Sequence, residues 1–419
     1  MISIELLRDR PEVVRRAMEA RGQDAPIDRI LQLDVKRRDI IVETDRLRMR
    51  RNTVSKEIGQ MKPPPKELVE EMRGVSAQVK EFEAHIRAIE EEIGSLLLTL
   101  PNLPREAVPA GKDASENREM RSAGTPRSFG FEPLPHWDIG ERLGIIDLER
   151  GAKLSGSRFY ILKGMGARLQ RALIDWMLDV HTQEHGYEEV YVPYLVNSAT
   201  VTGSGQLPKF AETMYRDAEE DLWLIPTAEV PVTGMFAGEI LRQDRLPMQF
   251  VAHTPCFRRE KAAAGKDTRG IKRVHQFEKV EMYKFVEPST SDGELQRMLS
   301  DAEDICKRLE IPYKVIELCT GDLGFAAAQT YDIEMWAPGS KEWLEVSSCS
   351  NCDDFQARRA NVRYRPADGG RVLFPHTLNA SGLALPRVIA AILENYQQAD
   401  GSVSVPAALR SYMGTERIG

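Results

Sequence analysis

The feature that most constrains the fold is an apolar repeat in the N-terminal quarter of the chain. Nine apolar residues are spaced alternately four and three apart: Leu68, Met72, Val75, Val79, Phe82, Ile86, Ile89, Ile93 and Leu96. This spacing averages 3.5 residues, which is typical of a two-stranded coiled coil. A weaker version runs from Leu33 to Ile58, and Pro63–Pro65 separate the two. Because proline ends a helix and the connection is short, we expect an antiparallel helical hairpin at about 28–100, with roughly 25 residues (about 40 Å) per helix.

Charge is distributed unevenly along this predicted hairpin. Eight basic and four acidic residues lie between Lys36 and Glu57, whereas the second half is rich in Glu. These charges could simply pair across the seam of a solvated coiled coil. Alternatively, a basic stripe could follow a nucleic-acid backbone. The segment alone leaves both interpretations open.

Composition excludes several classes of protein. The 419 residues include 57 Lys+Arg and 64 Asp+Glu, a net charge of −7, so any nucleic-acid surface must be a local basic patch. No apolar stretch approaches the roughly 20 residues that span a bilayer, and the charged first residues do not fit a signal peptide. Five cysteines are too few for a secreted disulfide scaffold. We therefore expect a soluble cytoplasmic protein of two or three domains.

The most informative segment runs from Phe250 to Phe285. Two predicted strands, 248–260 and 276–285, flank a loop in which seven basic and two acidic residues lie between Arg258 and Arg273. Such a loop favours an anionic ligand. Because alternate residues of a strand share a face, Arg258 and Glu260 should lie together on the first strand. Four residues should share one face of the second: Phe277, Lys279, Glu281 and Tyr283. This set could bind a ligand, or it could be a surface ion-pair ladder with the Phe277 ring in the core.

Two further segments fit the same face. Residues 341–348 form a predicted strand that ends in a carboxylate and hydroxyls, which are ligands suited to Mg²⁺. Residues 379–387 open a predicted helix that continues to Tyr396. Pro386 fits the first helical turn, and Arg387 would then lie at the positive end of the helix, where an anion is stabilised.

Three shorter motifs carry less weight. His181–His185 matches the HxxEH string of zinc proteases, but the match is five residues long on one amphipathic helix. Cys349–Cys352 is a single CxxC without a partner pair. Gly265 and Lys266 lack the upstream glycine of a phosphate-binding loop, because residue 260 is Glu. We expect no structural zinc and no dinucleotide-binding fold.

In order along the chain, these segments resemble the motifs of class II aminoacyl-tRNA synthetases, and specifically those of the seryl-tRNA synthetase family. The first family motif resembles 165–193, the second 257–281 and the third 379–387, while the serine-specific loop resembles Pro226–Glu229. The resemblance implies an α+β fold with an N-terminal coiled-coil hairpin and a catalytic domain built on an antiparallel sheet flanked by helices. The implied boundaries are a tRNA-binding domain at 1–104, a linker at 105–135, rich in Pro and Gly, and a catalytic domain at 136–419.

The resemblance also implies an activity. A serine--tRNA ligase activates L-serine with ATP, releases pyrophosphate and transfers the seryl group from seryl-adenylate to the 3′ end of tRNA(Ser); tRNA(Sec) is a further acceptor left open. The implied cofactor is Mg²⁺ and the implied assembly a homodimer away from membranes. Two alternatives are a synthetase-like ligase that loads a carrier protein and a non-catalytic paralogue. The hairpin argues against the first, and the presence of Glu260, Glu281, Glu345 and Arg387 argues against the second.

Residue roles follow from the resemblance only. The residues implied in catalysis are Arg258 (α-phosphate and serine carboxylate), Glu260 (adenine side) and Arg387 (γ-phosphate). Those implied in ATP binding are, besides these three, Arg259, Val274, Phe277 (stacking on adenine), Glu345, Val346, Ser347 and Ser348. Those implied in serine binding are Thr227, Ala228 and Glu229 near the ammonium, Glu281 and Ser381 near the hydroxyl, and also Arg258 and Asn379. Glu345 and Ser348 would bind Mg²⁺, although strict strand alternation would put Ser347 beside Glu345. The tRNA-binding residues would be Arg46, Arg48, Arg50 and Arg51.

Overall fold

The computed structural model describes residues 1–261 and 269–419, and the chain forms two compact units. One comprises 2–19 and 23–101, and the other comprises residue 1, 20–22 and 102–419. Gly265 and Lys266, considered above for a phosphate-binding loop, lie outside the described residues. In the part of the chain that the structure describes, no helix is long and apolar enough to cross a membrane.

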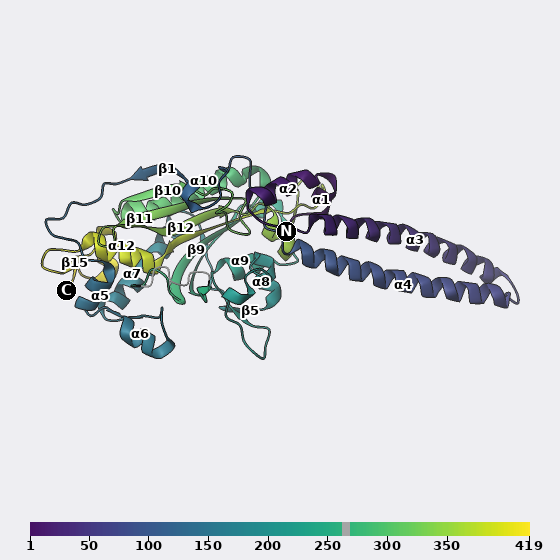
Figure 1. Ribbon diagram of the computed structural model, residues 1–419, viewed down its shortest axis with the longest axis horizontal. Coiled ribbons are helices and arrows are strands. Elements are labelled where there is room, and N and C mark those ends of the chain that lie inside the picture. Colours follow the sequence, from purple (N-terminus) through teal and green to yellow (C-terminus); the bar gives the residue numbers. More distant parts are fainter. Residues whose placement is uncertain (262–268) are drawn as a thin grey trace. The chain divides into compact units, whose positions relative to one another are not determined.

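The first unit contains the predicted helical hairpin, which is confirmed (Figure 1). Short helices α1 (Ile4–Asp9) and α2 (Pro11–Ala20) precede the long helices α3 (Ile27–Gln60) and α4 (Lys66–Leu97). The long helices have 34 and 32 residues, or about 50 Å each, and are longer than expected. The apolar face explains the difference, because Ile27 and Ile30 extend it toward the N-terminus of α3 and are buried. The seam itself includes Leu47, Met72, Val75 and Val79.

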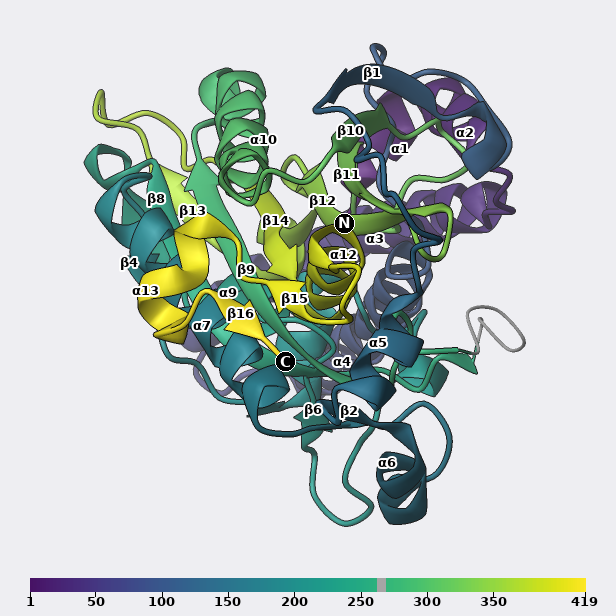
Figure 2. The ribbon, with the colours of Figure 1, turned by 90° about the vertical axis from the view of Figure 1, so that its left-hand side faces the viewer.

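The second unit is built on an eight-stranded sheet in the order β1-β10-β11-β12-β14-β9-β8-β4 (Figure 2). All neighbouring pairs are antiparallel except β4–β8. The strands are β1 (Arg118–Ala123), β4 (Glu188–Glu189), β8 (Met248–Phe257), β9 (Gln276–Val286), β10 (Tyr313–Glu317), β11 (Gln329–Ala337), β12 (Glu342–Asn351) and β14 (His376–Ala384). Residues 105–135, expected as a linker, thus include the edge strand β1 of this sheet.

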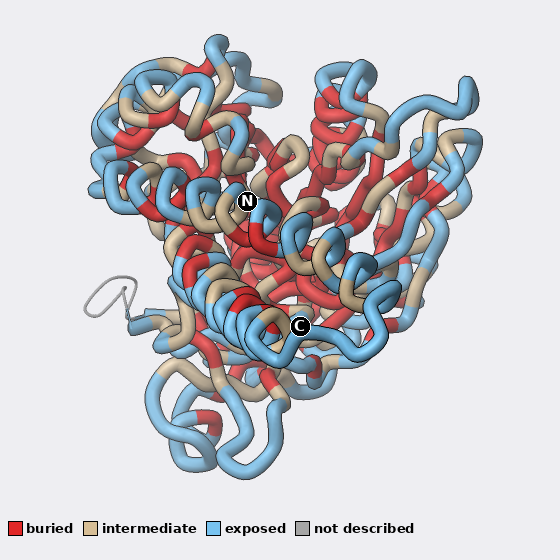
Figure 3. Tube along the Cα trace, turned by 90° about the vertical axis from the view of Figure 1, so that its right-hand side faces the viewer, coloured by how far each residue is buried: buried red, intermediate tan, exposed pale blue. Residues whose placement is uncertain are grey.

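Three long helices cover one face of the sheet. They are α7 (Met165–Gln183), α10 (Ser291–Arg308) and α12 (Leu385–Tyr396), and their apolar residues share one large core with the strands. Val280 and Met282 of β9 point into this core. The alternate residues Lys279 and Glu281 therefore face the other way, which is the face that carries the polar cavity described below. Figure 3 shows buried residues in the interior and exposed residues around them.

The remaining elements are short. They are α5 (His136–Arg142), β2 (Ile146–Asp147), α6 (Leu148–Ser155), β3 (Ile161–Leu162), β5 (Leu195–Val196), α8 (Ser198–Ser204), β6 (Trp223–Leu224), α9 (Glu229–Gly234), β7 (Ile240–Arg242), α11 (Phe355–Ala360), β13 (Arg363–Arg365), β15 (Val403–Ser404), α13 (Arg410–Met413) and β16 (Arg417–Ile418). Of these, α9 and α11 pack with β8 and β9 in a second, smaller core that includes Tyr283 and Phe285.

Candidate active site

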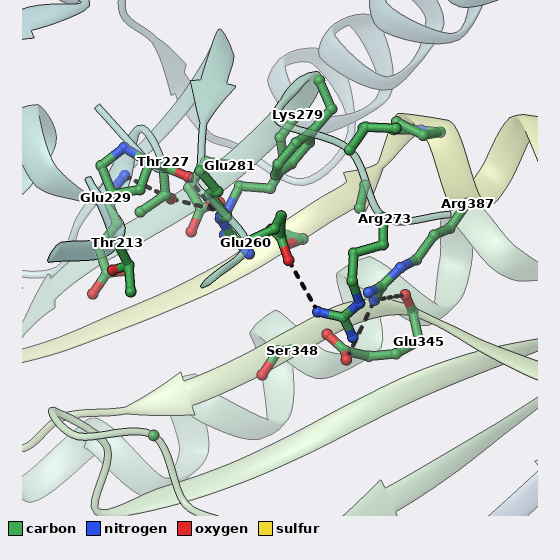
Figure 4. Close-up of a pocket in the computed structure, with 18 of the residues that line it drawn as sticks. Thr213, Thr227, Glu229, Glu260, Arg273, Lys279, Glu281, Glu345, Ser348 and Arg387 are labelled. Carbon is green, nitrogen blue, oxygen red and sulfur yellow. Dashed lines mark hydrogen bonds and ion pairs between the residues drawn. The ribbon is translucent and has the colours of Figure 1, made fainter. Parts of the chain in front are cut away.

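A cavity of about 630 Å³ opens on the polar face of the sheet (Figure 4). Its walls come from β9, β12, the end of β14 with the start of α12, the segment after β8, and the turn before α9. The residues expected in the site that line it are Thr227, Glu229, Arg258, Glu260, Val274, Phe277, Glu281, Glu345, Val346, Ser348, Asn379, Ser381 and Arg387. Three expected residues, Ala228, Arg259 and Ser347, are not part of its lining.

Arg258 lies just beyond the end of β8, because that strand stops at Phe257. The expectation that Arg258 and Glu260 share a strand face is therefore wrong, and Glu260 has a positive φ of 47°. Both side chains reach the cavity nevertheless, since the chain turns there instead of continuing as a strand. The Arg258 guanidinium lies over the Phe277 ring, 5.1 Å from its centroid, and its Nε donates to the Pro226 carbonyl at 3.2 Å. Phe277 lines the cavity and also packs against the large core, so the sheet face is not simply a surface ion-pair ladder.

One end of the cavity holds a compact group of charges (Figure 4). The Lys279 ammonium pairs with the Glu281 carboxylate and donates to Thr227 Oγ1 at 2.8 Å. Both Lys279 and Glu281 are buried. Burial raises the pKa of Glu281, and the adjacent Lys279 opposes that rise. Burial, with the nearby charge of Glu281, also raises the pKa of Glu229 to about 7. This end therefore combines two acidic groups with one cation, all largely shielded from bulk water, which suits a small zwitterion with a hydroxyl group.

The other end of the cavity is rich in arginine. Arg387, in the first turn of α12, pairs with the Glu345 carboxylate at 3.3 Å and donates to its backbone carbonyl at 2.6 Å. Arg273 pairs with Glu260 at 3.2 Å. Lys272 also lines this region. Three cations gathered at one end of a concave site suit a polyanion such as a triphosphate.

A β-bulge decides which serine faces the cavity with Glu345. In the pairing of β11 with β12, Ile333 is opposite Ser347 and Glu334 is opposite Glu345, so Val346 is an extra residue in β12. The bulge changes the alternation, and Ser348 lines the cavity with Glu345. Ser347 is buried and donates to the Ser381 carbonyl at 2.6 Å.

Several cavity residues carried no assigned role in the sequence analysis. Lys272, Arg273 and Lys279 belong to segments noted there for charge or face, so their signal was present but not assigned. Gln206, Phe210, Thr213, Met214, Gly324 and Phe325 also line the cavity. They come from irregular segments around short elements, where neither a periodic pattern nor a charge run marks them.

The two histidines of the zinc-protease string contact each other. His181 Nδ1 lies 3.0 Å from His185 Nδ1, and burial lowers the pKa of His181 to about 3. Cys349 and Cys352 are free, buried thiols. Within residues 1–261 and 269–419, no group of three or more His, Cys, Asp or Glu side chains could hold a metal ion.

The arginines expected to bind tRNA lie on the hairpin and pair with neighbouring acids. Arg46 pairs with Glu43 at 2.6 Å within α3. Arg48 pairs with Glu83 of α4 at 2.8 Å, and Arg50 pairs with Glu71 of α4. These three arginine side chains are also exposed, so the pairs are compatible with either interpretation of the charge stripe. Within the described residues no ion pair involves Arg51, although its charge acts on Glu83.

Comparison with known proteins decides the family. Residues 1–104 match the family described as seryl-tRNA synthetase N-terminal domain, and residues 210–396 match the tRNA synthetase class II core domain (G, H, P, S and T). A protein of Thermomicrobium roseum named serine--tRNA ligase is 56% identical, and the match covers 100% of this chain and 95% of that protein. The chain belongs to the seryl-tRNA synthetase family.

Further relatives agree with this membership. A serine--tRNA ligase of Herpetosiphon aurantiacus is 54% identical, with 100% of both chains covered. The crystal structure of seryl-tRNA synthetase from Pyrococcus horikoshii complexed with ATP has a TM-score of 0.94 and 39% identity, covering 100% of this chain and 99% of that one. The expected fold and enzyme class, an α+β aminoacyl-tRNA ligase, are confirmed, and neither the carrier-protein ligase nor the non-catalytic paralogue is favoured.

Proposed function

We propose that this chain activates L-serine with ATP and transfers the seryl group to the 3′ end of tRNA(Ser). The observation that carries the proposal is the convergence of Arg258, Phe277, Glu281 and Arg387 on one cavity. The names of the relatives and the ATP bound by the Pyrococcus horikoshii enzyme support the same choice of substrates. The proposal covers tRNA(Ser) alone, because no comparison supports tRNA(Sec). A homodimer and a cytoplasmic location, implied by the family, are further parts of the proposal.

The serine would occupy the end of the cavity that holds the buried charges. Glu229 and Thr227 would accept hydrogen bonds from the serine ammonium. Glu281 and Ser381 would lie around the serine hydroxyl, since these two residues are directly paired in neighbouring strands. Alanine lacks the hydroxyl and would leave the buried Glu281 carboxylate without that partner, which disfavours alanine strongly. Arg258 would bridge the serine carboxylate and the α-phosphate, since it lines the cavity and its charge acts on Glu229 and Glu281.

The chemistry requires no nucleophile from the protein. A carboxylate oxygen of serine attacks the α-phosphorus, the bond from that phosphorus to the bridging oxygen breaks, and pyrophosphate leaves with the electron pair. The chain supplies orientation and positive charge near the phosphoryl oxygens, through Arg258 and Arg387. Phe277 would hold the adenine ring by stacking, with Val274 and Glu260 beside it.

Magnesium would bind at Glu345 and Ser348. The bulge at Val346 brings this carboxylate and this hydroxyl to the same wall, and both are oxygen ligands of the kind Mg²⁺ prefers. When bound, the ion would neutralise charge on the phosphates. Arg387, adjacent to Glu345, would contact the γ-phosphate directly.

The experiment that tests the proposed function is ATP–pyrophosphate exchange with each of the twenty amino acids. Exchange that depends on serine, with every other amino acid far below it, is the expected result. Exchange with a different amino acid, or with none, would refute the choice of substrate.

The proton affinity of Glu229 leads to a pH prediction. Because its pKa is raised to about 7, its carboxylate is ionised above that pH and increasingly protonated below it. Only the ionised form attracts the serine ammonium, so kcat/KM for serine should fall as the pH decreases from 8 to 6, approaching tenfold per unit below the pKa. The measurement is exchange at low serine and saturating ATP. A flat profile over this range would contradict the assigned role of Glu229.

The domain division is proposed together with a role for the hairpin. Residues 1–104 would bind tRNA through Arg46, Arg48, Arg50 and Arg51, and 136–419 would form the catalytic domain, to whose sheet the intervening segment 105–135 contributes β1. Changing Arg46, Arg48 and Arg50 together to Glu should lower tRNA charging by about tenfold or more at physiological salt, because each reversal replaces a phosphate contact by repulsion. Serine-dependent exchange needs no tRNA and should persist in the same preparation. Equal loss of both activities would contradict this division of labour.

A further inference from the structure

Gln356 of α11 lies directly behind the proposed serine end of the cavity. It is fully buried and is not part of the cavity lining. Its Nε2 donates to Glu229 Oε1 at 2.5 Å and to the Ser204 carbonyl at 2.9 Å. Its Oε1 accepts from the Tyr283 hydroxyl at 3.1 Å and from Thr377 Oγ1 at 2.6 Å. All four hydrogen-bonding positions of the amide are therefore used.

These partners determine which way the amide points. Exchanging its nitrogen and oxygen would place the oxygen against two acceptors, the Glu229 carboxylate and the Ser204 carbonyl. Because unpaired buried polar groups are costly, only the observed orientation satisfies the network, and the donor necessarily faces Glu229.

The two carboxylate oxygens of Glu229 have different surroundings. Oε1 accepts from Gln356 and, at 3.2 Å, from Asn379 Nδ2. Among the described residues, no donor reaches Oε2. The carboxylate is thus held at one oxygen, while the other remains available to a ligand on the cavity side.

We infer that Gln356 is a positioning residue for amino-acid binding: it fixes the Glu229 carboxylate through one oxygen so that the other meets the ammonium of the substrate. The inference rests on the proposed function, because it takes Glu229 as the ammonium site. We expect Gln356 to affect the binding of serine but not that of ATP, since the hydrogen bonds of Gln356 do not extend to the arginine-rich end of the cavity.

The charges around Glu229 give this role a pH signature. Glu281 and Lys279 of β9, together with Arg258, act on the Glu229 carboxylate, and the Tyr283 hydroxyl and the Cys352 thiol are its other titratable neighbours. Donation from Gln356 favours the ionised carboxylate and so lowers its pKa against the effect of burial. Loss of the donor should therefore move the fall in kcat/KM for serine to higher pH.

The test compares two buried glutamines of the same unit. Gln356→Met removes the donor to Glu229. Gln329→Met is the matched control, because Gln329 is also buried and donates to a glutamate, Glu317 Oε1, at 2.9 Å, but lies outside the cavity. The exchange assay gives KM for serine, KM for ATP and kcat, and thermal unfolding reports stability.

Gln356→Met should raise KM for serine about tenfold or more, leave KM for ATP within about twofold, and shift the pH profile upward. Gln329→Met should lower the unfolding temperature without changing KM for serine. If the two variants behave alike, or if Gln356→Met alters both KM values equally, Gln356 is merely structural and the inference is wrong.

A milder variant keeps the test decisive if Gln356→Met does not fold. Thr377→Val preserves side-chain shape and removes one of the two donors that orient the Gln356 amide. It should raise KM for serine several-fold while KM for ATP stays constant, and an unchanged serine KM would overturn the inference. Exchange by the wild-type protein separates the two hypotheses. If the wild-type protein shows no serine-dependent exchange, the proposed function is wrong. If it does, but the variants keep the wild-type KM for serine, only the role of Gln356 is wrong.

Discussion

Replacing Arg258 by methionine is expected to lower serine-dependent ATP–pyrophosphate exchange by a factor of about 10² to 10³. Arg258 lines the cavity close enough to Glu229 and Glu281 for its charge to act on both, and the serine carboxylate and the α-phosphate would meet beside it. Charge develops there as the new bond forms, and a fixed guanidinium stabilises it more than mobile water does. Methionine retains much of the apolar contact with the Phe277 ring, so the loss should appear mainly in kcat/KM rather than in thermal stability.

Arg245 provides a matched control for this substitution. Its guanidinium also lies over a phenylalanine ring, 6.0 Å from the centroid of Phe236, but it is exposed and outside the cavity. Arg245→Met should therefore leave exchange close to the wild-type rate. Similar exchange rates in the two variants would remove Arg258 from the proposed reaction centre.

Changing Glu281 to glutamine is expected to reduce exchange on the order of 100-fold, because a charged acceptor at the serine hydroxyl is replaced by a neutral amide. The same change leaves the buried Lys279 without its paired carboxylate. Breaking a buried pair from one side costs about 3–5 kcal/mol of stability, although the nearby Glu229 should reduce that figure. Exchange must accordingly be measured with thermal unfolding, at a temperature where the variant is folded.

A second buried pair on the same strand separates the two effects. Lys284 of β9 pairs with Glu294 of α10 at 3.0 Å, and both residues are buried away from the cavity. Glu294→Gln should lower the unfolding temperature comparably while exchange persists. Near-normal serine activation by Glu281→Gln, or equal loss of exchange in both variants, would exclude Glu281 from the serine pocket.

The parts of this fold that sequence reasoning predicted are those governed by a repeating pattern. The hairpin follows from a 3.5-residue apolar period interrupted by prolines. Because this period extends over many turns, it determines the two helices without help from distant parts of the chain. The strand β9 follows from alternation, and its Phe277, Lys279 and Glu281 do share the cavity face. The Pro386 turn correctly placed Arg387 at the start of α12.

The parts that escaped prediction depend on local departures from regular geometry. Because of the bulge at Val346, Ser348 rather than Ser347 lines the cavity, whereas strict alternation predicts Ser347. Glu260 adopts a left-handed conformation where a continuing strand was expected. Gln356 joins Glu229 from 127 residues away in sequence, so nothing local indicates their contact. Such features arise from tertiary packing, which a single sequence read by period and charge does not contain.

The arginine-rich end of the cavity has a consequence for what can bind there. Arg387 and Arg273 each have a carboxylate partner within the chain, Glu345 and Glu260 respectively. An entering anion must compete with those carboxylates, so its net gain is the difference between two ion pairs rather than the strength of one. A monovalent anion gains little from such an exchange. A chain of linked phosphates could displace both carboxylates when it binds. We therefore expect this end of the cavity to prefer anions of high charge over monovalent anions.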